Sequence, residues 1–129
     1  MRRTRLRQDD VFLLFFEKGT IMLLAWVNLF LAGLLEVCWA IGLKYTDGFS
    51  KLVPSLFTLA TLIGSMLLLA KAVQVLPIGT AYGIWVGIGA LGTAVLGILL
   101  LHEPLSILRF MFLSLLLISI IGLKYTASV

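Results

Sequence analysis

The chain has 129 residues, of which 61% are hydrophobic and only 12% are charged, with a formal net charge of +4. A water-soluble domain of this length cannot bury so much apolar surface, so the composition indicates an integral membrane protein and excludes a soluble enzyme. The residues after position 23 have room for four spans of about 20 residues each and for no further folded domain. We therefore expect an all-α integral membrane protein with four transmembrane helices per subunit.

Residues 1–23 form an N-terminal extension that does not fit a span. The segment MRRTRLRQDD is rich in arginine, and the apolar run VFLLFF after it is too short to cross a bilayer. A basic start followed by an apolar run is also typical of a signal peptide, but no small-residue cleavage site follows. We expect this extension to be a mis-assigned start of translation or a disordered segment, and residues 24–129 to form the membrane domain.

The first predicted span, residues 24–43, contains Glu36 well inside an apolar run. An ionisable side chain at such depth is costly, usually faces a bundle interior or a water-filled cavity, and is a functional hypothesis by default. Helical spacing places Gly33 and Trp39 on the same face as Glu36. Cys38 points to another face, and as the single cysteine it can form neither an internal disulfide nor a metal cluster. Glu36 is therefore the leading candidate for a functional residue.

The second and third predicted spans bring further polar side chains into the membrane. The second, residues 52–70, has three internal hydroxyl groups, and each of these can bond back to its own helix. The third, residues 78–101, places Tyr82 and Trp85 on one face, three positions apart. It is also rich in glycine, which favours close packing of one helix against another. The hydroxyl groups of the second span belong to Thr58, Thr61 and Ser65.

The fourth predicted span, residues 105–123, is almost wholly apolar. Its composition is typical of a helix that faces lipid or associates with another subunit. The residues before it, His102 and Glu103, stand at the expected water boundary with no catalytic partner, which favours a solvated turn. The three prolines, Pro54, Pro77 and Pro104, lie at or just before the starts of the last three spans, where proline disturbs a helix least.

The basic residues beside the four spans are almost evenly divided between the two sides of the membrane. Lys71 and Lys124 lie on one side, and Lys44, Lys51 and Arg109 on the other. Since the numbers of Lys and Arg residues in short loops set orientation, a balance of two against three predicts a chain that can insert both ways up. The extension would change this balance, because it adds five basic residues to the first side and should hold that end in the cytoplasm: Arg2, Arg3, Arg5, Arg7 and Lys18.

A single buried carboxylate among aromatic rings suits the binding of cations, by opposite charge and by cation–π contact. Its negative charge can be compensated by a proton or by an organic cation. Binding both at once is disfavoured, so the proton and the cation compete for the carboxylate. Such competition is the minimum requirement for a proton/cation antiporter. A planar guanidinium is a natural ligand, because it presents two parallel N–H donors to one carboxylate.

Four short helices enclose a cavity poorly, whereas a homodimer has eight helices and two copies of Glu36. Subunits in opposite orientations would explain the even charge balance and would resemble the inverted repeats of larger transporters. We therefore expect a homodimer, with the bilayer, protons and a small cation as its other partners. No cofactor, metal or nucleic acid is expected, since the sequence has no phosphate-binding loop and no cluster of metal ligands.

Two segments resemble the small multidrug resistance family, AGLLEVCWAIGLKYTDGF at 32–49 and LPIGTAYGIWVGIGA at 76–90. The resemblance extends over about residues 24–125, and tryptophan three positions after the glutamate is similar to the guanidinium-exporter branch. It implies an antiparallel, dual-topology homodimer in the bacterial plasma (inner) membrane that exports guanidinium in exchange for protons. Glu36 would be the shared proton and substrate site, Gly33 would line the pocket, and the residues that order the site would be Trp39, Ser65, Tyr82 and Trp85.

Two other functions stay open at this point. The first is a broader exporter of quaternary ammonium or other lipophilic cations, against which Trp39 and Ser65 argue, because a rigid, hydrogen-bonded site suits a small polar cation. The second is a membrane scaffold or assembly factor that transports nothing, for which Glu36→Gln would be tolerated. Catalysis is not expected, since no nucleophile–base pair lies in the predicted spans.

Overall fold

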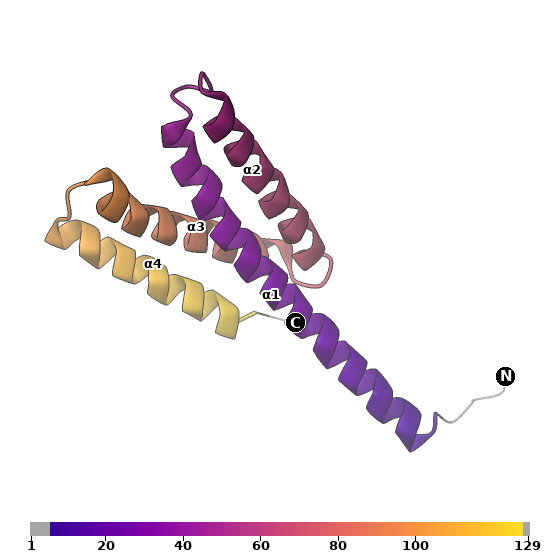
Figure 1. The fold of residues 1–129 in the computed structure, drawn as a ribbon. Helices are drawn as coiled ribbons and strands as arrows, with labels where there is room; N and C mark the ends of the chain where they lie inside the picture. The colour runs from indigo at the N-terminus through magenta and orange to yellow at the C-terminus, as the bar shows by residue number, and fades with distance from the viewer. Residues whose placement is uncertain (1–5, 128–129) are drawn as a thin grey trace.

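The computed structural model describes residues 6–127, and this part of the chain forms four helices and no strand (Figure 1). All four are long and apolar enough to cross a membrane, which confirms the expected all-α architecture. The second and third predicted spans agree with the structure to within two residues. The fourth helix begins two residues later than predicted, because Ser106 caps it by accepting a hydrogen bond from the Arg109 backbone N–H at 3.1 Å. The helices are α1 (Gln8–Tyr45), α2 (Leu52–Ala72), α3 (Ile78–Leu101) and α4 (Ile107–Tyr125).

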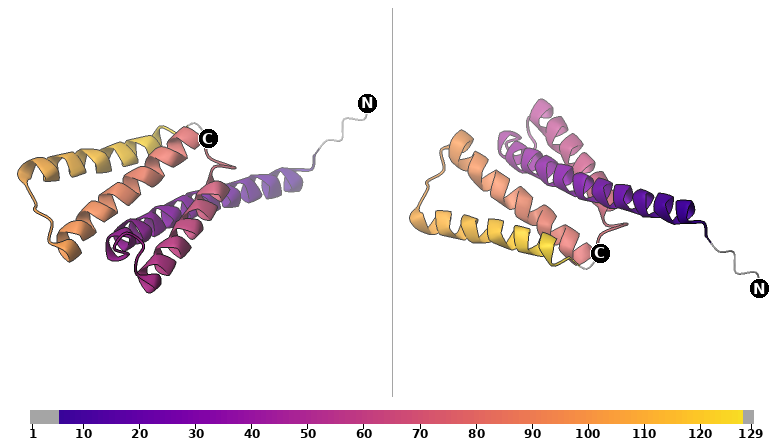
Figure 2. Two further views of the ribbon diagram at one scale, coloured as in Figure 1. Left: turned by 90° about the horizontal axis from the view of Figure 1, so that it is seen from above. Right: turned by 90° about the horizontal axis from the view of Figure 1, so that it is seen from below.

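Helix α1 is much longer than the first predicted span. Its 38 residues correspond to about 57 Å at 1.5 Å per residue, whereas the hydrocarbon core of a bilayer is about 30 Å thick. The N-terminal part of α1 therefore projects beyond the other helices (Figures 1 and 2). The extension is thus helical from Gln8 onward and continues without a break into the first span. Arg2, Arg3 and Arg5, which contribute to the predicted charge asymmetry, lie outside the described residues.

Helix α3 lies between α1 and α4, and α2 packs mainly on α1 (Figure 2). Glycines allow this close packing. A Cβ atom added at Gly33 of α1 would lie 2.7 Å from Ile88 of α3, and one added at Gly92 of α3 would lie 2.5 Å from Val37 of α1. The opposite face of α3 meets α4 in the same way, since Gly87 lies against Ile120. The glycines of the third span therefore serve two helix contacts, one on each side of α3.

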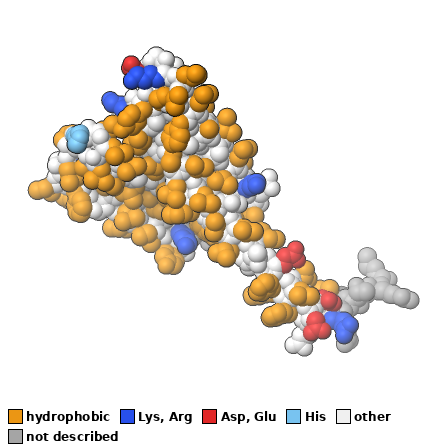
Figure 3. Space-filling model, viewed as in Figure 1, with side chains coloured by type: hydrophobic (Ala, Val, Ile, Leu, Met, Phe, Trp, Pro, Cys, Tyr) orange, Lys and Arg blue, Asp and Glu red, His pale blue; other side chains and the backbone are white. Residues whose placement is uncertain are grey.

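The surface is apolar along most of the bundle. Figure 3 shows hydrophobic side chains over the visible face, with charged side chains near its ends and along the projecting part of α1. Helix α4 has no buried residue, although it is as hydrophobic as α1. A surface of this kind is stable in lipid or against another subunit. The four apolar helices thus indicate a multi-pass membrane protein.

Candidate functional site

Glu36 lies near the middle of the membrane-spanning part of α1 and faces a cavity of about 360 Å³ between α1, α3 and the start of α4. Small residues of α3 form much of its wall, which leaves room for a small ligand beside the carboxyl group. Two charged residues close the end of the cavity toward the α3–α4 loop. The lining residues are Glu36, Val86, Gly89, Ala90, Thr93, Ala94, Glu103 and Arg109.

The carboxyl group of Glu36 crosses from α1 to the backbone of α3. It lies directly against Gly89, where a Cβ atom would collide with the Cδ and Oε2 atoms of Glu36. Oε2 is buried and has no hydrogen-bond partner among residues 6–127. Leaving a buried polar atom unpaired costs about 1–3 kcal/mol, so the position is unfavourable for stability alone. A carboxyl group that lines a cavity and has an oxygen without a protein partner can accept a proton or bind a cation.

One turn before Glu36, two side chains converge on the backbone carbonyl oxygen of Ala32. The hydroxyl of Ser65 in α2 donates to this oxygen at 2.7 Å, and the indole Nε1 of Trp85 in α3 donates to it at 3.2 Å. Nε1 also lies 3.0 Å from the Ser65 hydroxyl oxygen, which can accept from it. All three residues are buried. In a regular helix the carbonyl oxygen of Ala32 accepts from the N–H of Glu36, so this cluster fixes the turn of α1 that carries the carboxyl group.

The other candidate residues surround this turn at different depths. The Tyr82 ring packs against the Trp85 ring with 5.6 Å between centroids, and more than half of the Tyr82 side chain is exposed. Trp39 is half-buried, and its Nε1 has no hydrogen-bond partner in the described chain. Gly33 is buried in the contact with α3. The structure therefore brings Ser65, Tyr82 and Trp85 together, but none of the candidate side chains hydrogen-bonds to Glu36.

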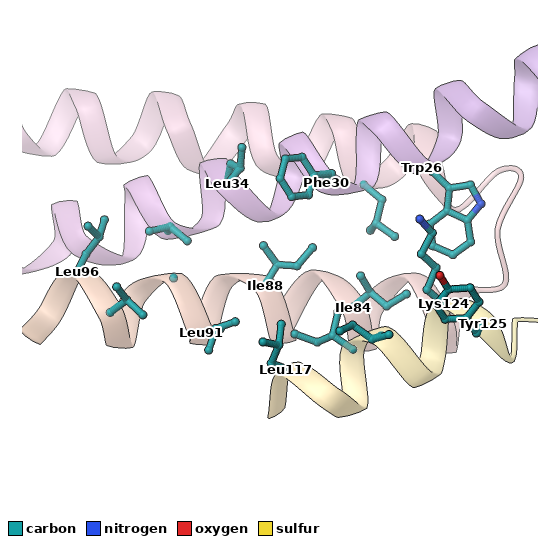
Figure 4. Close-up of a pocket in the computed structure, with 16 residues that line it drawn as sticks. Trp26, Phe30, Leu34, Ile84, Ile88, Leu91, Leu96, Leu117, Lys124 and Tyr125 are labelled. Atoms are coloured by element: carbon teal, nitrogen blue, oxygen red, sulfur yellow. The ribbon is translucent and has the colours of Figure 1, made fainter. Parts of the chain in front are cut away.

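A second, larger groove of about 810 Å³ runs between α1, α3 and α4 and is almost entirely apolar (Figure 4). Leu34, Ile88 and Leu91 are among its lining residues. At one end, the Nζ atom of Lys124 lies 5.6 Å from the centroid of the Trp26 ring, in a cation–π contact. Glu36 does not line this groove. Its walls lack an acidic group, so the smaller cavity is the better candidate for a cation site.

Sequence reasoning found only Glu36 among the residues of the smaller cavity and missed the other seven, which include Gly89, Thr93, Glu103 and Arg109. Gly89 and Thr93 are four positions apart on one face of α3, but nothing in the sequence says that this face meets Glu36. Glu103 lies in an exposed loop, as expected, and the structure also pairs its carboxylate with Arg109 at 2.5 Å. No group of three or more His, Cys, Asp and Glu side chains in residues 6–127 could hold a metal ion.

Residues 24–116 match the model of the small multidrug resistance protein family. The chain belongs to this family. The matched residues include Glu36, the Ser65–Trp85 cluster and both walls of the smaller cavity. They exclude the part of α1 that precedes residue 24, and the second half of α4. Together with the four apolar helices, membership of the small multidrug resistance family identifies a multi-pass protein of the inner membrane.

Several relatives that bear the name guanidinium exporter are similar to most of this chain. The protein from Yersinia pseudotuberculosis is 58% identical over 101 residues, which cover 78% of this chain and 97% of the relative. The protein from Salmonella typhimurium is 55% identical over 104 residues, or 81% of this chain and 99% of the relative. The Escherichia coli protein is 54% identical over 101 residues, or 78% and 96%.

Proposed function

We propose that this chain is a proton-coupled antiporter that exports guanidinium and other small guanidinyl cations. The observation that carries the proposal is the carboxyl group of Glu36, held at membrane depth in a small cavity, with one buried oxygen that no described residue pairs. The names of the relatives, which are guanidinium exporters at 54–58% identity, support the choice of cation. The negative charge of the carboxylate is compensated either by a proton or by the cation. Because the two bind in turn, the movement of protons is coupled to that of guanidinium.

The remaining candidate residues have positioning roles in this proposal. Ser65 and Trp85 hold the Ala32 carbonyl and thereby the turn of α1 that presents Glu36. Tyr82 braces the Trp85 ring, and Trp39 offers an unpaired indole N–H one turn beyond Glu36. Gly33 allows α1 to approach α3 closely enough for the carboxyl group to reach Gly89. A rigid site of this kind favours a small, planar, hydrogen-bonding cation over a bulky quaternary ammonium ion.

The transporting unit is proposed to be an antiparallel homodimer formed by residues 24–129, with residues 1–23 as an extension. Two features support a partner subunit. Helix α4 buries no residue within the chain, and the cavity at Glu36 is bounded by only α1, α3, the start of α4 and the α3–α4 loop. A second copy in the opposite orientation would cover exposed apolar surface, and the near-even division of Lys and Arg residues over residues 24–129 favours neither orientation.

The test is guanidinium-driven proton movement in liposomes that contain the purified full-length protein. Wild-type protein should move protons when a guanidinium gradient is imposed, and Glu36→Gln should reduce the signal to that of protein-free vesicles, because the amide cannot alternate between two charge states. Glu17→Gln is the matched control, since Glu17 lies on the exposed projecting part of the same helix and should be replaceable without effect.

Three results would reject the proposal. Activity of Glu36→Gln equal to wild type would remove the carboxylate from the mechanism. Stronger coupling to tetramethylammonium than to guanidinium would favour the broader cation exporter. No coupled flux with either cation, from protein that is folded and inserted, would favour a scaffold.

A further inference from the structure

A second carboxylate, that of Glu103, lies at the mouth of the cavity that contains Glu36. The chain reverses direction at His102, which has a left-handed conformation with φ 54°. The backbone N–H of Glu103 then donates to the carbonyl oxygen of Gly97 at 3.1 Å. Gly97 is buried, and a Cβ atom there would lie 2.9 Å from Cδ of Glu103. The missing side chain at position 97 thus lets the Glu103 carboxylate fold back onto α3.

The group that Glu103 holds is a guanidinium, that of Arg109. Nη2 of Arg109 contacts Oε2 of Glu103 at 2.5 Å, and Nη1 donates to the carbonyl oxygen of Pro104 at 3.0 Å. The carboxylate and the carbonyl therefore form a two-point acceptor for a planar cation. The side chains of Arg109 and Glu103 are 32% and 42% exposed. A pair so open to water contributes little to stability, so the arginine can be exchanged for another cation.

The path from this pair to Glu36 is a single face of α3. Gly89, which touches Glu36, and Gly97, which touches Glu103, are eight residues apart, or about 12 Å along the helix. The residues of α3 that line the cavity between them are small, namely Ala90, Thr93 and Ala94, and leave room for a small cation beside the helix. The hydroxyl of Thr93 is buried in this stretch and has no hydrogen-bond partner among the described residues. It offers one polar contact partway along an otherwise apolar wall.

We propose that Glu103 is an outer binding site for the transported cation, in which the guanidinium of Arg109 is the resident occupant that the incoming cation displaces. The inference rests on the proposed function. A guanidinium ion arriving from water takes the place of Arg109 on the carboxylate, and the arginine side chain turns toward solvent. The charge at the cavity mouth is the same before and after the exchange. The bound cation then moves along α3 to Glu36, while Arg109 returns to Glu103.

Opposite effects of two substitutions test this site. Glu103→Gln removes the acceptor and should raise the KM for guanidinium about threefold, the effect expected of one partly exposed ion pair. Arg109→Gln removes the competing occupant and should lower the KM about twofold. The maximal rate should change little in either variant, since Glu36 is intact. An ion pair that only stabilises the α3–α4 loop predicts the same direction of change in both variants, because each breaks the same bond.

Asp47→Asn is the matched control, because it removes one negative charge from the α1–α2 loop, on the same side of the membrane but outside the cavity. It should leave the KM unchanged. An equal rise of the KM for guanidinium in Asp47→Asn and Glu103→Gln would mean that surface charge alone causes the rise, and would overturn the inference. The inference would also be overturned if the KM stayed unchanged in Glu103→Gln and Arg109→Gln, or moved in the same direction in both. If Glu103→Gln fails to fold, the KM of Arg109→Gln still tests the inference. A lowered KM in that variant supports the outer site, since a damaged loop does not improve binding. Wild-type protein without coupled flux would instead reject the proposed function.

Discussion

The membrane-spanning parts of α1 and α4 are equally hydrophobic. Nevertheless α1 has seven buried residues and α4 has none. The buried residues of α1 are mostly small, such as Ala25, Ala32 and Gly33, and allow neighbouring helices to come close. Helix α4 instead presents large side chains such as Phe110 and Phe112, which are exposed. Hydropathy therefore identifies a membrane helix, whereas the size of its side chains determines how closely other helices pack on it.

Among changes to helix packing, the largest effect is expected from a methyl group added where α3 meets α1. Gly89→Ala should lower guanidinium transport at least about tenfold, which corresponds to about 1.4 kcal/mol, because its Cβ atom displaces the Glu36 carboxyl group from α3. The thermal stability should change little, since the end of a flexible side chain moves rather than backbone. Gly19→Ala in the projecting part of α1 is the matched control, and its Cβ atom would meet nothing within 4 Å. A comparable loss of transport in Gly19→Ala would show that the effect of Gly89→Ala does not come from the contact with Glu36.

An intermediate effect is expected from the hydrogen bonds that fix α1. Trp85→Phe keeps most of the ring but removes the N–H that reaches Ala32 and Ser65, which should lower the free energy of unfolding by about 1 kcal/mol. Reversible unfolding in mixed micelles measures this change. Ser65→Ala and the double variant complete a double-mutant cycle. The losses of unfolding free energy in the two single variants should not add up in the double variant, because Ser65 and Trp85 share one acceptor. Additive losses would mean that the two side chains act independently.

The smallest effect is expected where α4 approaches α1. Lys124→Gln removes the cation over the Trp26 ring, a contact of about 0.5–1 kcal/mol at an exposed site. Unfolding should become easier by this amount, and guanidinium transport should stay within experimental error of wild type, since Glu36 does not line that groove. In the Lys124→Gln background, Trp26→Leu should lower the free energy of unfolding only by the packing energy of the lost ring, because the cation–π contact is already absent. A loss of transport in Lys124→Gln would connect the apolar groove to the transport path.

Most of the fold could be predicted from the sequence, since apolar runs of about 20 residues bounded by polar turns have only one stable form in lipid. The span boundaries of α2 and α3 agree with the structure because prolines and charged residues mark them. The start of α1 could not be predicted in this way. The run VFLLFF is too short for a span, and only the structure shows that it extends the same helix.

The candidate site was predictable in part. Glu36 was evident, because a buried acid is conspicuous in a chain of this composition. The residues that face Glu36 could not be predicted, since Gly89 and Thr93 resemble the other small residues of α3 in the sequence. The convergence of Ser65 and Trp85 on the Ala32 carbonyl joins residues 33 and 53 positions apart along the chain. Their hydroxyl and indole groups could as well have bonded within their own helices or remained unpaired.

The amino-acid sequence by itself determined that this protein crosses a membrane four times and that one acidic group lies inside it. Both follow from local composition, because the exclusion of charge from lipid acts on every segment separately. Only the tertiary structure decided which face of α3 meets Glu36, and that Glu103 with its bound Arg109 shares the same cavity. Contacts of this kind depend on how closely glycines let three helices approach, and that distance is a property of the packed helices together.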